Sequence, residues 1–274
     1  MNRNYLIITS SILLYFIPFA LLTGPFLPDL FLSLISLIFI YISFNEKLWK
    51  YYKNNFFYIF FLFYLYILFR SILSDSVLLS LESSLFYFRF GIFSLAVCFL
   101  IDNNNKLIKF FTIAIIITFV FATINGLFQS YYGENFFGVV NKSPNRLSLL
   151  LDDNLALGNY LSRLLPLVIG LFIYSFSNNK YKLPILTILL ILTIMTIYLS
   201  GERTALGITL IFIVMFYVLI RGYKKIKVFL FIISIMSIIL SSYINPQIHN
   251  RNIWFTLNEV NLFSSDEGRI IIFS

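Results

Sequence analysis

The sequence predicts an all-α fold: a polytopic membrane bundle of about nine transmembrane helices with two longer loops on the outer side. Hydrophobic residues make up 59% of the 274 residues, charged residues make up 12%, and the mean hydropathy is +0.89. A soluble globule needs far more polar surface than this composition supplies. Apolar runs of membrane-spanning length recur along the whole chain. We therefore expect residues 1–274 to form a single transmembrane domain.

Each predicted span is an apolar run close to the roughly 20 residues that a helix needs to cross a bilayer. In chain order the runs are 5–22, 26–44, 56–73, 85–101, 107–124, 160–176, 183–199, 204–220 and 228–243. The first run follows Met1-Asn2-Arg3, a start typical of a signal sequence, but it has no convincing small-residue cleavage site. We interpret it as an uncleaved anchor.

The basic residues of the short loops predict the orientation, because they gather on the cytoplasmic side of a membrane protein. With the N-terminus in the cytoplasm, that side receives ten lysines and two arginines: Arg3, Lys47, Lys50, Lys53, Lys106, Lys109, Lys180, Lys182, Arg221, Lys224, Lys225 and Lys227. The outer side receives one lysine and seven arginines: Lys142, Arg70, Arg89, Arg146, Arg163, Arg203, Arg251 and Arg269. The loop 125–159 and the segment 245–274 are then both outside.

This orientation can be tested by cysteine labelling from outside the cell, with Cys98 first removed. Cysteines placed at Ser143 and Asn250 should react with an impermeant reagent, and one placed at Asn178 should not, because the bilayer separates the two sides. Labelling of the Asn178 site alone would overturn the arrangement.

The excess of arginine on the outer side predicts an anion-binding site there. Lysine and arginine determine membrane orientation equally well, whereas only the planar guanidinium of arginine is suited to bidentate contacts with phosphate or carboxylate. Ten of the twelve acidic residues also fall outside, so the formal net charge of +8 comes from the cytoplasmic anchors. Nucleic acid is therefore excluded as a partner, despite a pI near 9.4.

The sequence has too few cysteines and histidines for a metal site built from thiolate or imidazole ligands. Cys98 and His249 are the single cysteine and the single histidine, which excludes a disulfide framework, a Cys-based metal site and a His-rich cluster. We expect Cys98 to be a small buried side chain within its apolar run, and we expect neither a metal nor a cofactor.

The candidate functional centre is the ion-bearing break Ser200-Gly201-Glu202-Arg203 between two apolar runs. An acid and a guanidinium at a membrane boundary usually mark function. Arg203 stands at the outward start of a predicted helix, where the helix dipole favours an anion. Glu202 could orient Arg203 or its neighbours. The alternative for Arg203 is an anchor at the lipid headgroups.

The other candidates also have plainer alternatives. Arg89, in the run 85–101, either snorkels to the interface or pairs with Asp75 or Glu82, or else it contributes to an outward anion pocket. Asp152, Asp153 or Asn154, in the polar second half of the loop 125–159, acts either on substrate or as a helix N-cap. The loop itself is long enough to suggest function or disorder.

Three stretches together resemble the O-antigen polymerases and O-antigen ligases, the lipid-linked glycan polymerases and ligases of the bacterial envelope. The first runs from Arg146 through Gly158-x-x-Leu161 to Arg163 and Pro166, and is similar to the arginine, small loop and proline-bearing helix of that family. The second is Leu199-Ser200-Gly201-Glu202-Arg203-Thr204-Ala205, and the third is Gly268-Arg269 followed by apolar residues. The resemblance covers roughly 146–274 and the general many-helix layout before it.

The resemblance implies a metal-independent glycosyltransferase on the periplasmic face of the bacterial inner membrane. Such enzymes take a glycan linked through diphosphate to undecaprenol and pass its reducing end to a hydroxyl of another lipid-linked glycan or of lipid A core. Arg146, Arg203 and Arg269 would bind the diphosphate, Glu202 would assist Arg203, and Arg89, Arg163, Asp152 and Asp153 would be accessory.

This chain departs from the family pattern in one respect. The family continues with a large outer loop and further helices, and its candidate general base is a histidine in that later part. His249 precedes Arg269, so that role is not carried onto it, and we expect the reading frame to continue past Ser274. The alternatives are a polysaccharide or lipid-glycan flippase, which should show paired broken helices in two halves, and a non-catalytic membrane fragment.

Overall fold

The computed structural model describes residues 3–140, 146–150, 155–176 and 182–219, with single positions at 232, 236 and 239. Within these residues the fold is helical, with one short 3-10 turn and an isolated bridge between Glu134 and Val140. Six helical segments are long and apolar enough to cross a membrane: Arg3–Thr23, Phe26–Asn45, Asn55–Ile72, Val77–Asn103, Leu107–Tyr132 and Leu157–Ser175. The apolar helices indicate a multi-pass membrane protein, as predicted. The predicted run 228–243 lies largely outside the described residues.

The contacts among the helices divide the chain into two compact units. The first unit is Met1–Leu21 with Pro25–Ala114, and the second is Leu22–Gly24 with the described residues from Ile115 onward. Helices of one unit pack mainly against one another, and the apolar character of the spans does not show which of them will pack together.

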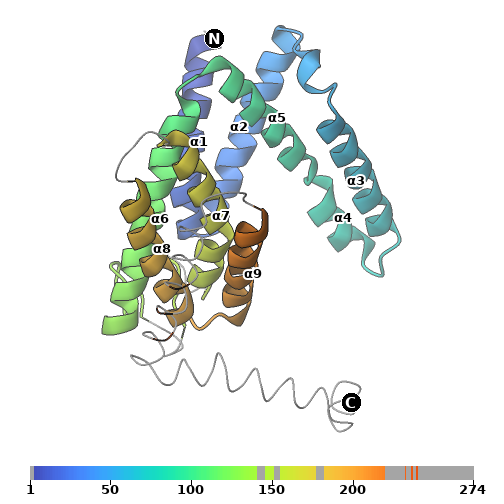
Figure 1. Cartoon of the computed structure of the whole chain (residues 1–274). Coiled ribbons are helices and arrows are strands. Elements are labelled where there is room, and N and C mark those ends of the chain that lie inside the picture. The colour runs from blue at the N-terminus through green and yellow to red at the C-terminus, as the bar shows by residue number, and fades with distance from the viewer. Residues whose placement is uncertain are drawn as a thin grey trace. The chain divides into compact units, whose positions relative to one another are not determined.

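The first unit contains α1 (Arg3–Thr23), α2 (Phe26–Asn45), the 3-10 turn η1 (Trp49–Tyr51), α3 (Asn55–Ile72), α4 (Val77–Leu85) and α5 (Phe88–Asn103) (Figure 1). Its core forms where α2 packs against α5. Ile35, Phe39 and Ile42 recur at helical spacing on one face of α2 and are buried. The rings of Phe39 and Phe99 have centroids 5.6 Å apart across this contact.

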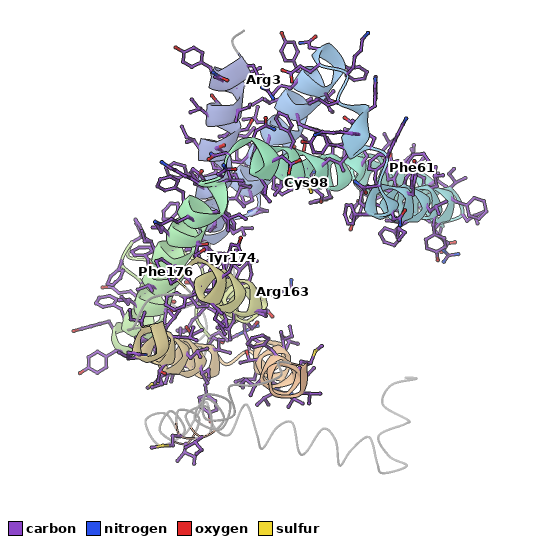
Figure 2. The ribbon with its side chains drawn as sticks, turned by 45° about the horizontal axis from the view of Figure 1, so that its top comes forward. Arg3, Phe61, Cys98, Arg163, Tyr174 and Phe176 are labelled. Atoms are coloured by element: carbon purple, nitrogen blue, oxygen red, sulfur yellow. The ribbon has the colours of Figure 1, made fainter. Side chains whose placement is uncertain are left out.

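In contrast, α3 leaves most of its aromatic and aliphatic side chains exposed, among them Phe56, Phe61 and Phe69. Figure 2 shows Phe61 on this helix. Such a surface would be unfavourable in water, but lipid tails are as apolar as these side chains. Its neighbour α4 packs against it.

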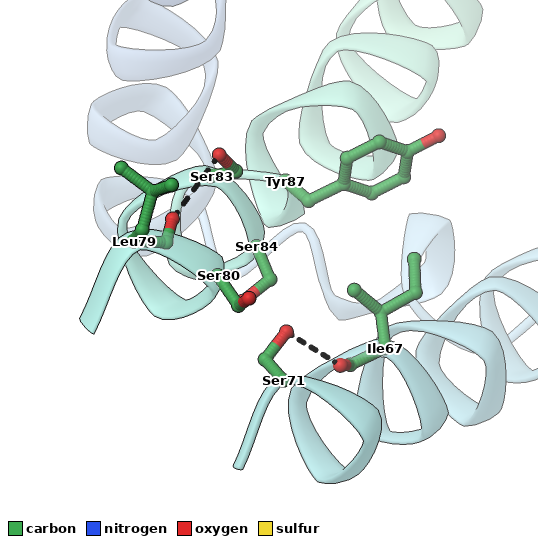
Figure 3. A pocket seen from close by; sticks show the side chains of 7 residues that line it. All are labelled: Ile67, Ser71, Leu79, Ser80, Ser83, Ser84 and Tyr87. Atoms are coloured by element: carbon green, nitrogen blue, oxygen red, sulfur yellow. Dashed lines mark hydrogen bonds between the residues drawn. The ribbon is translucent and has the colours of Figure 1, made fainter. Parts of the chain in front are cut away.

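A groove of about 420 Å³ lies along this α3 and α4 pair (Figure 3). It is lined by Ile67, Ser71, Leu79, Ser80, Ser83, Ser84 and Tyr87. Its serine hydroxyls are already engaged nearby: Ser71 donates to Ile67 O at 2.9 Å, and the hydroxyls of Ser74 and Ser80 are 2.6 Å apart. These hydroxyls therefore form their hydrogen bonds within the α3 and α4 pair, as buried polar groups in an apolar setting must.

The second unit contains α6 (Leu107–Tyr132, from Ile115 onward), α7 (Leu157–Ser175), α8 (Lys182–Leu199) and α9 (Arg203–Leu219) (Figure 1). At its centre α7 packs against both α8 and α9. One face of α7 is fully buried through Leu157, Leu161, Leu165 and Val168, whose spacing is helical. Tyr174, on the opposite side, is exposed (Figure 2).

Three local features differ from the sequence-based expectations. α6 continues past residue 124 to Tyr132 and ends at Gly133, whose φ is +81°, so the first eight residues of the predicted loop 125–159 are helical. The predicted loop before residue 85 contains α4. Cys98 is exposed rather than buried (Figure 2). The buried positions of α5 are Gly91, Leu95, Ala96, Phe99 and Leu100, and Cys98 is not among them.

Candidate functional site

The turn between α8 and α9 places the side chain of Glu202 in the interior of the second unit. Ser200 is buried and its hydroxyl donates to Ile197 O at 2.7 Å. Gly201 has φ +63°, the left-handed region that side chains with a Cβ avoid. After this reversal Glu202 is only 3% exposed, and α9 begins at Arg203. The predicted ion-bearing break is therefore a real turn with its acid buried.

The carboxylate of Glu202 accepts hydrogen bonds from the start of α7. Its Oε1 accepts from the backbone N–H of Gly158 at 2.9 Å and its Oε2 from that of Asn159 at 3.1 Å. The first N–H groups of a helix have no partner within the helix, and the positive end of the helix dipole favours a negative charge. Glu202 thus caps a neighbouring helix from the turn.

The residue at the N-cap of α7 is Ala156, whose side chain makes no capping hydrogen bond. Neither Asp152 nor Asp153 occupies that position, and both lie outside the described residues, as does Arg269. The acid that serves α7 comes instead from 44 residues further along the chain.

Gly158 is needed for this close approach. A Cβ added at Gly158 would collide with Ser200 Oγ and lie 3.0 Å from Ser200 Cβ and 3.1 Å from Glu202 Oε1. A second contact joins the two helix starts, since Thr204 Oγ1 donates to Asn159 Oδ1 at 3.3 Å. The helix starts of α7 and α9 therefore meet at the turn.

Two arginines act on the charge of Glu202. Burial raises the pKa of Glu202 above its ordinary value, while the N–H groups of Gly158 and Asn159 and then the guanidiniums of Arg146 and Arg163 oppose that rise. Arg163 is an exposed residue of α7 (Figure 2). Within the described chain no ion pair joins Glu202 to Arg146 or Arg163. Arg146 and Arg163 are therefore near enough to stabilise the negative charge of Glu202, and Arg203 follows Glu202 in the chain.

Three guanidinium groups, those of Arg146, Arg163 and Arg203, accompany the carboxylate of Glu202. Both carboxylate oxygens of Glu202 are engaged by backbone N–H groups. Arg146 is half-buried, and its Nε is buried with no hydrogen-bond partner in the described part of the chain. Arg203 is also half-buried, at the first turn of α9. Such an arrangement can bind an anion through guanidinium groups next to two helix starts.

Arg89 belongs to the first unit and has a different partner from those predicted. Its Nη2 lies 2.7 Å from Asp29 Oδ2, so the ion pair is with neither Asp75 nor Glu82. Asp75 and Glu82 are the nearest acids along the chain, but Asp29 lies nearer in space because α2, which carries it, packs against α5. The guanidinium also lies over the ring of Phe90, 5.3 Å from its centroid.

Sequence reasoning missed a set of buried amides beside the site: Asn125 and Gln129 near the end of α6, and Asn135 just beyond it. They hydrogen-bond to the loop backbone and to the segment that carries Arg146. Asn125 and Gln129 are four residues apart, on one helix face. That spacing of two amides in an apolar helix was the available signal.

Within the described residues, no group of three or more His, Cys, Asp or Glu side chains could hold a metal ion. Comparison of the chain with protein-family models, with curated proteins and with solved structures found no match.

Proposed function

We propose that this chain is a glycosyltransferase of bacterial envelope polysaccharide assembly, of the O-antigen ligase or O-antigen polymerase type. It would lie in the inner membrane with about nine spans and a cytoplasmic N-terminus, and act on the periplasmic face. The observation that supports this proposal most is the turn where the buried Glu202 carboxylate holds the start of α7, within electrostatic reach of Arg146 and Arg163. The sequence resemblance pointed to Arg146, to Arg163 and to the same Glu202-Arg203 turn.

In this proposal the donor is a glycan joined through diphosphate to undecaprenol. The oxygen of an acceptor hydroxyl, on another lipid-linked glycan or on lipid A core, forms a bond to the sugar C1. The bond from C1 to the diphosphate oxygen breaks, and its electron pair leaves with the undecaprenyl diphosphate. The hydroxyl proton passes to a base.

The arginines would stabilise the charge that gathers on the leaving diphosphate. Arg146 and Arg203, with Arg269, bind its oxygens, and Arg163 adds positive charge from α7. Fixed donors of this kind are each worth a few kcal/mol in a water-poor site. Glu202 acts by positioning, because its oxygens already hold the start of α7. The lipid tail confines the donor to the interface where these groups lie.

The test is a binding measurement on the full chain in lipid nanodiscs, with undecaprenyl diphosphate as the probe and undecaprenyl monophosphate as its comparison. The diphosphate should bind more tightly, and Arg146→Ala should weaken its binding about tenfold or more, since hydrogen bonds to charged groups contribute roughly 1.5–3 kcal/mol. Arg70→Ala, which removes an exposed arginine of the first unit, is the matched control. Equal affinity for the two lipids, or full affinity in Arg146→Ala, would contradict the proposal.

A further inference from the structure

The segment that carries Arg146 is attached to α6 by one amide. Gln129 is 0% exposed and Ser148 is 1% exposed. Gln129 Nε2 donates to Ser148 Oγ at 2.6 Å, and Gln129 Oε1 accepts from the backbone N–H of Ser148 at 3.1 Å. The nitrogen and the oxygen of the Gln129 amide thus both bind Ser148. These two hydrogen bonds fix the orientation of Ser148 as well as its position.

Further bonds hold the same segment on its other side. Asn135 Nδ2 donates to the carbonyls of Leu149 at 3.2 Å and Leu150 at 2.9 Å. The N–H of Leu150 donates to Leu22 O at 3.1 Å, a residue of the same unit. Ser148, Leu149 and Leu150 are therefore each tied by a buried hydrogen bond, and the chain has little freedom where it leaves Ser148 towards Arg146.

The reach of Arg146 follows from this attachment. Two residues of extended chain span about 7 Å at most, so the backbone of Arg146 stays close to the anchored Ser148. A buried amide in an apolar helix is costly unless both its polar ends are paired. A leucine at position 129 would suit a membrane-spanning helix better than glutamine does. Here the amide instead forms two hydrogen bonds to Ser148, two residues from a charged side chain.

We propose that Gln129 is a positioning residue of the diphosphate site: by holding Ser148 it presents Arg146 at the Glu202 turn. This inference rests on the proposed function, because the ligand of Arg146 is the diphosphate named there. It adds that the donor affinity of the site depends on a hydrogen bond that no ligand touches.

A double-mutant cycle tests it. In the full chain in nanodiscs, Gln129→Leu should weaken binding of undecaprenyl diphosphate by about fivefold to tenfold, close to the loss in Arg146→Ala. In the Arg146→Ala background the same Gln129→Leu change should weaken binding less than about twofold, since the group that it positions is already gone. Thr123→Val is the matched control: Thr123 is also buried in α6, but its hydroxyl donates only within its own helix, to Phe119 O.

The outcomes separate the two proposals. If Arg146→Ala weakens binding but Gln129→Leu does not, or if Gln129→Leu weakens binding equally in both backgrounds, the positioning role is overturned and the diphosphate site stands. If Arg146→Ala binds like the unaltered chain, the proposed function is overturned, and the positioning role with it.

A milder variant covers the case in which Gln129→Leu fails to fold. Ser148→Ala removes the hydroxyl partner and keeps the backbone N–H bond to Gln129. On a logarithmic scale, its loss of diphosphate affinity should be about half of the loss in Gln129→Leu. In addition, a cysteine at position 146, with Cys98 replaced by serine, should react with a thiol reagent at a rate that Ser148→Ala changes severalfold. An unchanged rate would show that the attachment does not position residue 146 and would overturn the inference.

Discussion

Replacing Glu202 by alanine should lower the free energy of unfolding by about 2–4 kcal/mol. The change leaves the buried N–H groups of Gly158 and Asn159, now 2.9 and 3.1 Å from the carboxylate, without an acceptor. Each unsatisfied buried donor costs roughly 1–3 kcal/mol. Removal of a buried charge returns part of this loss, because burial opposes the ionised form. Unfolding in mixed micelles with increasing denaturing detergent measures the difference.

Three further variants make the result specific. Glu202→Gln keeps the shape of the side chain and one accepting oxygen but turns an NH₂ group towards the second backbone donor, so its loss should be intermediate. Gly158→Ala should be destabilising by about 1–3 kcal/mol, because its Cβ displaces Ser200 and the carboxylate. Thr204→Val removes only the exposed bond to Asn159, and should stay within about 0.5 kcal/mol. A Glu202→Ala protein as stable as Thr204→Val would show that the cap contributes nothing.

Arg203→Lys should insert into the membrane normally and yet lose most glycan transfer, with at least about a tenfold loss of diphosphate affinity. Lysine keeps the positive charge but lacks the planar fork that binds two phosphate oxygens at once. Arg203 also begins α9, where the positive end of the helix dipole favours an anion. Transfer from lipid-linked glycan in membranes, together with nanodisc binding, measures both effects.

The comparison with alanine decides between the diphosphate contact and a headgroup anchor. Arg203→Ala should be only modestly worse than Arg203→Lys if the fork is what matters. If Arg203 only anchors α9 at the headgroups, lysine should substitute almost fully by snorkelling. Arg70→Lys, at an exposed position at the end of α3, controls for the loss of an arginine as such. Near-normal transfer by Arg203→Lys would leave the diphosphate contact without support.

The long apolar runs determined most of the helices by themselves. The predicted spans 26–44, 56–73 and 183–199 correspond to α2, α3 and α8 within a residue or so. A run of about 20 apolar residues in a bilayer has to form hydrogen bonds within itself, and only a helix allows this. Boundaries were missed where polar residues occur inside a helix. Asn125 and Gln129 suggested the beginning of a loop, but both are buried, the Asn125 oxygen and both ends of the Gln129 amide form hydrogen bonds, and α6 continues through them.

The sequence also singled out the turn at Ser200 to Arg203, because charged residues between two apolar runs are conspicuous in any linear reading. What Glu202 does there depended on the tertiary structure. Its partners are backbone N–H groups of Gly158 and Asn159, and every residue has a backbone N–H, so no pattern of side chains announces them. The same holds for Arg89 and Asp29, which are 60 residues apart and meet because α2 packs against α5. Local hydrophobicity determines where helices form, whereas the packing of their faces decides which polar groups become neighbours.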